Sequence, residues 1–153
     1  MRLILILILN FGALVLGALL MNGSPASNEW YSELNKAPWT PPGWMFGIAW
    51  TVIMITYAFY MDRVIAMVDR DFLTKIYILY ALQWVLNVIW NPVFFAWHLP
   101  ILGAIVIFLL IVVLVSVNIY YSTRNTVNLI LLTPYVLWLS VAFSMNLYIV
   151  IMN

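Results

Sequence analysis

The sequence predicts an all-α integral membrane protein, built as a single bundle of five transmembrane helices. Of its 153 residues, 67% are apolar and only 7% are charged, whereas soluble domains contain about 45–50% apolar and about 25% charged residues. Five apolar stretches are each long enough to cross a bilayer, which takes about 20 residues in a helix. Turn-forming or charged residues separate them, so we expect residues 1–153 to form one membrane domain.

The predicted spans follow one another along the chain, because a helix satisfies its own backbone polar groups inside lipid. Most of the connections are short, which favours packing of consecutive helices as antiparallel neighbours. We expect the spans at about residues 3–21, 44–63, 73–95, 101–122 and 127–150, with one long first loop at residues 22–42.

The first span also has features of a secretory signal peptide. Arg2 precedes its apolar run, and small residues follow at residues 24–26. However, the run is longer than the usual apolar core of ~7–15 residues, and a single Arg forms the basic region. These two features favour a transmembrane span, with the Leu/Ile stretch at residues 3–9 facing lipid.

The distribution of basic residues predicts the orientation. Of the six Lys and Arg residues, only Lys36 lies on the side of the membrane where the first and third loops are expected. By the positive-inside rule, the N-terminus is therefore expected in the cytoplasm if the membrane is a plasma or inner membrane. With a net charge of +1, the chain has too few cations to neutralise a run of phosphates, so we expect no nucleic-acid partner. The five basic residues on the N-terminal side are Arg2, Arg63, Arg70, Lys75 and Arg124.

The long first loop combines aromatic residues with prolines. Its length, about 20 residues, is typical of functional loops. Residues 28–35 are expected to form a short helix with Trp30 and Leu34 on one face, and Thr40 followed by Pro41 is a favourable N-cap and first-turn pair for the second span. We expect this segment to act as a lid, although an interfacial aromatic belt would also place Trp and Tyr here.

Amide and aromatic side chains form stripes inside three spans. An amide buried in hydrocarbon needs a partner, so Gln83, Asn87 and Asn146 should face the bundle interior or a cavity. Interhelical hydrogen bonding would account for Gln83. Asn87 and Asn146 lie beside indoles at the span ends nearest the first loop, which favours a pocket. The stripes comprise Phe46, Trp50 and Tyr57 in the second span, Gln83, Asn87 and Asn91 in the third, flanked by Tyr80, Trp84, Trp90 and Phe94, and Tyr135, Trp138, Ala142, Met145 and Asn146 in the fifth.

The composition of these stripes restricts the ligand. Flat indole and phenol walls suit a large planar conjugated molecule, whereas the lack of charge disfavours ion selection and proton relay. The sequence has no Cys, and its one histidine, His98, precedes Pro100 in a short loop, which disfavours an axial ligand to haem. We expect no metal site and no required cofactor. No hydrolytic triad or phosphate-binding loop is found, so a classical enzyme is not expected.

Four motifs together resemble the translocator protein family, also called tryptophan-rich sensory proteins or peripheral-type benzodiazepine receptors. They are Trp30-Tyr31-x-x-Leu34-x-Lys36 with Trp39-x-Pro41-Pro42, Trp50-Thr51, Asn87-x-x-Trp90-x-Pro92-x-Phe94-Phe95, and Pro134-Tyr135-x-x-Trp138-x-x-x-Ala142-x-x-x-Asn146.

The resemblance implies a five-helix bundle, usually a homodimer, that acts as a membrane receptor or sensor for porphyrins such as protoporphyrin IX and for benzodiazepine-type drugs. Light-dependent porphyrin degradation and transport of tetrapyrroles or sterols are the alternatives. In the photochemical case alone, Trp50 and Trp138 would be the reactive side chains. Matched by motif, the ligand-binding residues would be Tyr31, Trp39, Pro42, Trp50, Asn87, Trp138, Ala142 and Asn146, to which the stripes add Phe46, Trp90 and Tyr135.

Three positions depart from the family pattern. Ala37 stands where proline usually follows the lysine, and Met54 stands where an aromatic residue is common, which would alter one wall of the pocket. No Lys or Arg follows Leu147-Tyr148, so the proposed cholesterol-recognition pattern is incomplete. We therefore do not expect sterol as the physiological ligand.

Overall fold

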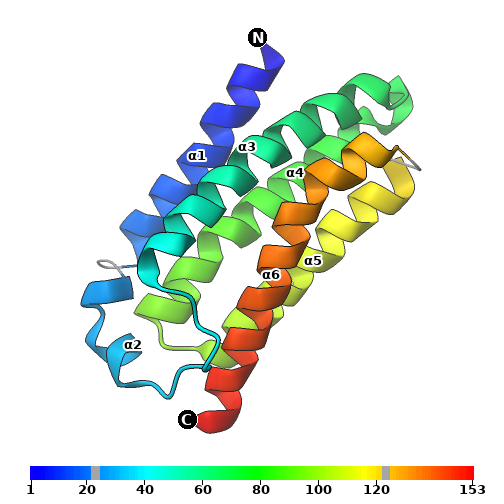
Figure 1. Cartoon of the computed structure of the whole chain (residues 1–153). Coiled ribbons are helices and arrows are strands. Elements are labelled where there is room, and N and C mark those ends of the chain that lie inside the picture. Colours follow the sequence, from blue (N-terminus) through cyan, green and yellow to red (C-terminus); the bar gives the residue numbers. More distant parts are fainter. Residues whose placement is uncertain (22–24, 122–124) are drawn as a thin grey trace.

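The computed structural model describes residues 1–21, 25–121 and 125–153, and within them the chain is helical with no strand (Figure 1). Five helices are long and apolar enough to cross a membrane, which confirms the all-α five-span prediction. The start of the first loop, the end of the fourth span and Arg124 fall outside the described residues. The spans are α1 (Arg2–Leu20), α3 (Gly43–Met67), α4 (Arg70–Asn91) with its extension η2 (Pro92–Ala96), α5 (Pro100–Tyr121) and α6 (Thr126–Met152).

The five spans form a ring in which each helix packs against two others. Going round the ring, α1 is followed by α3, α6, α5 and α4, which returns to α1. The prediction that spans joined by short connections are neighbours is therefore confirmed for α4 with α5 and for α5 with α6, and it is wrong for α3 and α4. These two helices make little backbone contact because α1 packs against both of them.

Buried hydrogen bonds fix α1 in this ring. Asn10, near the middle of α1, is buried, and its Nδ2 donates to the carbonyl oxygen of Met54 on α3 at 3.1 Å. The Tyr80 hydroxyl on α4 donates to Asn10 Oδ1 at 2.7 Å. Because each polar atom of this amide has a partner, its burial costs little. The first span is thus an integral helix of the bundle.

The lid begins with two short helices, η1 (Pro25–Ser27) and α2 (Glu29–Glu33). Asn28 caps α2, since its Oδ1 accepts the backbone N–H of Tyr31 at 2.9 Å. The predicted cap at Thr40 is wrong: α3 begins only at Gly43, with Pro42 as its N-cap. The physical reason is that a residue before proline avoids the helical conformation, so Pro41, which precedes Pro42, cannot form the first helical position after Thr40.

At its other end, α4 does not continue as a regular helix to residue 95. Pro92 has no N–H to donate to the preceding turn, and residues 92–96 form a π-helical turn closed by a 2.8 Å bond from Trp97 N to the Pro92 carbonyl. The wider turn buries both Phe94 and Phe95 under the lid. His98 follows with a positive φ of 56° and leads into α5.

Candidate ligand-binding cavity

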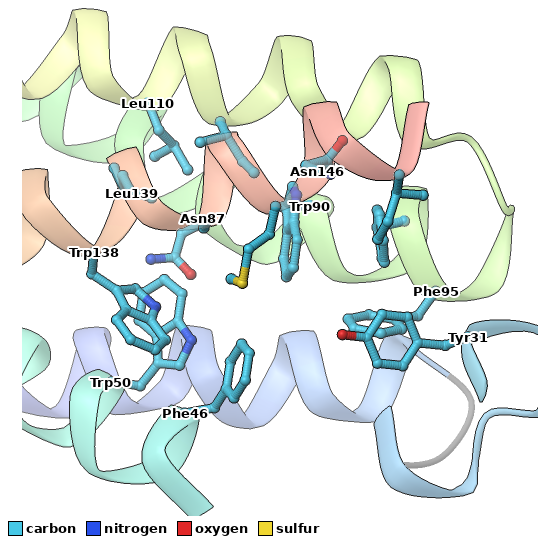
Figure 2. Close-up of a pocket in the computed structure, with 15 residues that line it drawn as sticks. Tyr31, Phe46, Trp50, Asn87, Trp90, Phe95, Leu110, Trp138, Leu139 and Asn146 are labelled. Carbon is cyan, nitrogen blue, oxygen red and sulfur yellow. The ribbon is translucent and has the colours of Figure 1, made fainter. Parts of the chain in front are cut away.

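A cavity lies inside the ring at the lid end of the bundle (Figure 2). Its volume is only about 50 Å³. Small-molecule sites usually provide about 300–1,000 Å³, so a large ligand requires its walls or lid to move. The lining residues are Tyr31, Phe46, Trp50, Asn87, Trp90, Phe94, Phe95, Ile107, Leu110, Trp138, Leu139, Ala142, Met145, Asn146 and Ile149.

The structure brings most of the sequence-predicted site residues to this one cavity. They come from the lid helix α2 and from α3, α4 and α6, whereas α1 contributes none of the lining. The predicted residues that line it are Tyr31, Phe46, Trp50, Asn87, Trp90, Trp138, Ala142 and Asn146.

Tyr135 lies behind the cavity wall instead of on it. Its side chain is fully buried, and its hydroxyl accepts hydrogen bonds from Gln83 Nε2 at 2.8 Å and from Asn87 Nδ2 at 2.6 Å. Its ring also meets that of Trp50 edge to face, with 6.0 Å between centroids. Tyr135 therefore positions two lining residues, Asn87 and Trp50, without facing the cavity.

Trp39 and Pro42 also lie outside the cavity lining. The Trp39 indole turns away to donate to Ser144 Oγ at 3.1 Å and to pack edge to face on Tyr148, and it is 53% exposed. Pro42 is exposed at the start of α3. Trp39 therefore anchors the exit of the lid on α6, and Pro42 marks the start of α3.

Aromatic contacts give the cavity its walls. Phe46 and Trp138 meet edge to face with centroids 5.3 Å apart, which ties α3 to α6. Trp90 is stacked on Phe94 at 5.4 Å. Such pairs are worth about 0.5–1.5 kcal/mol beyond burial, so they hold the indole planes in defined orientations that a flat ligand can stack against.

Several lining residues were not predicted as site residues. For Phe94 and Phe95 the available signal was Pro92, which predicts an irregular turn. Met145 was on the fifth-span stripe but was not named as a site residue, and Leu139, beside Trp138 on α6, could have been inferred from spacing. Ile107 and Leu110 carry no signal, because residues 100–115 of α5 include no polar side chain. Ile149, on α6, completes the unpredicted lining.

The lid covers the cavity by packing on the π-helical turn. Trp30 meets Phe94 edge to face at 5.5 Å and stacks on His98 at 4.4 Å, and Asn28 Nδ2 donates to the Phe95 carbonyl at 3.0 Å. Burial under this lid raises the pKa of Tyr31 above its ordinary value, because the phenolate would lose hydration.

The C-terminal end of α6 fastens the other side of the lid. The Asn35 backbone N–H donates to Asn153 Oδ1 at 2.9 Å, and Asn35 Nδ2 donates to the Met152 carbonyl at 3.3 Å. The lid is thus held by two separate groups of contacts, one on the turn after α4 and one on α6.

Two departures from the family pattern have clear places in the structure. Met54 is buried in the bundle core, where its carbonyl accepts the Asn10 bond, and it does not line the cavity. The expectation that Met54 alters a wall is therefore wrong, because its side chain points to the core between the spans. Ala37 is buried in the lid, and its carbonyl oxygen accepts a hydrogen bond from the Thr40 backbone N–H at 2.9 Å.

The fold and the cavity together define a class: a five-span membrane protein with an uncharged, indole-lined cavity closed by a lid. The TspO/MBR family matches residues 4–152. The chain belongs to this family, as its motifs indicated.

Curated relatives agree with this assignment. The chain is similar to Protein CrtK of Rhodobacter capsulatus, with 29% identity over 76% of this chain and 74% of the relative. It is also 29% identical to the tryptophan-rich protein TspO of Chlorobaculum tepidum, over 85% of this chain and 84% of that protein. The tryptophan-rich sensory protein of Cereibacter sphaeroides is 28% identical over 88% of this chain and 87% of that protein.

Proposed function

We propose that the protein is a membrane receptor or sensor that binds a planar tetrapyrrole, such as protoporphyrin IX, in the cavity under the lid. Benzodiazepine-type drugs would use the same walls. The observation that carries this proposal is the convergence of Trp50, Trp90 and Trp138 on one cavity that has no charged lining residue among those the structure describes. Indole faces favour stacking with a conjugated ring, and the macrocycle would need no axial ligand from the protein.

The narrow cavity makes binding a conformational event. A macrocycle cannot enter the accessible volume of about 50 Å³ unless the lid or the Phe46–Trp138 pair moves. Binding would therefore shift the population between closed and open lid, which is the property that a sensor requires.

A fluorescence titration tests this function. Added protoporphyrin IX should quench tryptophan emission saturably in purified protein, and Trp50→Ala or Trp138→Ala should weaken the affinity about tenfold through lost stacking. Trp44→Ala is the matched control, because Trp44 is exposed and lies outside the cavity. Equal titration curves for all four proteins would contradict the proposal.

A second candidate function is light-dependent porphyrin degradation. It is favoured by the presence of two oxidisable indoles, Trp50 and Trp138, on the cavity wall, where a photoexcited porphyrin would contact them. Illumination of the complex in air, with dissolved dioxygen as the oxidant, should then yield an open-chain product spectrum that Trp50→Phe and Trp138→Phe lose. Bleaching at the rate of free porphyrin in detergent would argue against this activity.

We also propose that the N-terminus faces the cytoplasm and that the protein is a homodimer. Arg2 forms a 2.6 Å ion pair with Asp62 near the end of α3, so the basic ends of α1, α3 and α4 gather on the side opposite the lid, which holds Lys36 (Figure 1). This distribution supports the orientation by the positive-inside rule. The dimer follows from the family resemblance, and cross-linking in membranes tests it.

A further inference from the structure

The cavity contains one amide that the protein itself leaves unpaired. Asn146 on α6 is only 2% exposed, and neither its Oδ1 nor its Nδ2 has a hydrogen-bond partner among the described residues. Buried side-chain amides are nearly always satisfied in native proteins, and leaving one unpaired is costly. Because Asn146 lines the cavity (Figure 2), the missing partner belongs to whatever occupies that space.

The other amide of the cavity is in a different state. Asn87 Nδ2 already donates to the Tyr135 hydroxyl at 2.6 Å, so this amide is tied into the interhelical network. Asn146 therefore stands out as the amide whose donor and acceptor are both available to a ligand.

Gly103 on α5 creates the space in which the Asn146 amide sits. A Cβ atom at residue 103 would lie 2.9 Å from Asn146 Nδ2 and 3.2 Å from the Phe94 ring. Both distances are shorter than normal van der Waals contact, so any larger residue would push the amide or the ring from its place. Gly103 is thus a positioning residue for Asn146.

The chemistry of the partner follows from the amide and its surroundings. No charged side chain among the described residues lines the cavity, so an ionised group placed directly against the buried Asn146 amide would carry a high desolvation cost. An unpaired Nδ2 requires an acceptor, and an unpaired Oδ1 requires a donor. A neutral group that carries N–H beside C=O on the edge of a ring satisfies both at once.

We propose that Asn146, positioned by Gly103, recognises the lactam-type edge of a planar ligand through two parallel hydrogen bonds. The ligand N–H donates to Oδ1, and the ligand carbonyl accepts from Nδ2. This inference rests on the proposed function, because it assumes that a planar molecule enters the cavity, and it adds the polar group by which such molecules are distinguished.

A pair of matched probes tests the proposal by calorimetric titration of the full chain in detergent. Phenanthridinone is a flat tricyclic lactam, and N-methylphenanthridinone keeps its shape but lacks the N–H donor. Wild-type protein should bind phenanthridinone about tenfold more tightly than N-methylphenanthridinone, as expected for net gains from hydrogen bonding in a dry site. In Asn146→Leu the ratio of the two affinities should fall to about one.

Asn118→Leu is the matched control, because Asn118 Oδ1 is also buried without a partner among the described residues but lies outside the cavity. It should retain the tenfold ratio. Gly103→Ala provides a second variant, which should reduce the ratio by displacing the amide while leaving Asn146 present. Asn146→Leu should unfold at the same or a higher temperature than wild type without ligand, since it removes an unpaired buried group.

The outcomes separate the two proposals. Equal affinity of wild type for both probes, or a ratio that persists in Asn146→Leu, would overturn lactam recognition and point to an ordered water on Asn146, while leaving planar-ligand binding intact. Failure of both probes and of protoporphyrin IX to bind wild type would instead refute the proposed function.

Discussion

At the scale of single residues, the Tyr135 hydroxyl connects the cavity wall to the bundle core. The hydroxyl accepts hydrogen bonds from both Gln83 and Asn87 on α4. The Tyr135 ring packs edge to face on that of Tyr57 of α3, with 5.2 Å between centroids. One side chain of α6 therefore joins three spans. This role explains why Tyr135, although it is on the aromatic stripe predicted for the fifth span, lies behind the cavity wall.

Tyr135→Phe should destabilise the protein by about 1–3 kcal/mol, because two buried amide N–H groups lose their acceptor. Thermal or denaturant unfolding in detergent measures the change. Tyr120→Phe is the control, since Tyr120 is on the exterior of α5 and should show no loss. Similar stability of both variants would contradict the structural role of the Tyr135 hydroxyl.

At the scale of elements, α1 supports the site without touching it. Gly17 on α1 packs directly against the Asn91 side chain of α4, so a Cβ atom there would overlap with that amide. Gly12, on the same helix, has open space around it. The α1–α4 contact thus depends on a small residue at one position and not at the other.

Gly17→Val should be less stable than Gly12→Val by about 1–3 kcal/mol, the range typical of overpacking. The comparison cancels the helix propensity of valine, since both substitutions lie inside α1. Unfolding of the two variants under one set of conditions gives the difference. If Gly12→Val were the less stable protein, the close approach of α1 to α4 would be wrong.

The lid should respond to alkaline pH through Tyr31. Burial raises the pKa of Tyr31 in the folded state above the ordinary value of 10.0. The free energy that this group contributes is therefore fully present below pH 10 and is lost as pH rises through the folded pKa. Unfolding temperatures measured from about pH 8 to about pH 11 should fall more steeply in wild type than in Tyr31→Phe. Parallel pH profiles would mean that Tyr31 is not desolvated under the lid.

The sequence was informative where a physical signal repeats along the chain. Length and hydropathy predicted the five spans, and the spacing of Trp138, Ala142 and Asn146 predicted one wall of the cavity. The ring order was not predictable, because a short connection between α3 and α4 does not reveal that α1 packs against both. Residues 100–115 of α5 include no polar side chain and gave no periodicity, so Ile107 and Leu110 were missed.

Trp39 and Tyr135 show a second limit of sequence reasoning. Both lie in the motifs that carry the family resemblance. However, Trp39 donates a hydrogen bond to Ser144, and Tyr135 accepts one from Gln83. A motif marks residues that matter to a site, but it does not distinguish the side chains that face the ligand from those that hold its walls. Hydrogen bonds across the bundle make that distinction.

At the scale of the whole molecule, the ring of helices combines a polar core at its centre with an aromatic cavity at one end. The buried bonds of Asn10 and Tyr135 hold the spans together, and the lid is attached to both α6 and the turn after α4. A stable bundle with a separately attached lid lets a ligand open one end without unfolding the rest.

The central claim is that the cavity beside Ala142 is where a planar ligand binds. Its most direct test is the affinity of Ala142→Leu for protoporphyrin IX, with Val141→Leu as control, because Ala142 lines the cavity and Val141 faces outward. We predict that Ala142→Leu binds at least about tenfold more weakly, since the larger side chain fills the space that the ligand needs, while Val141→Leu binds like wild type. Unchanged affinity in a folded Ala142→Leu protein would contradict the claim.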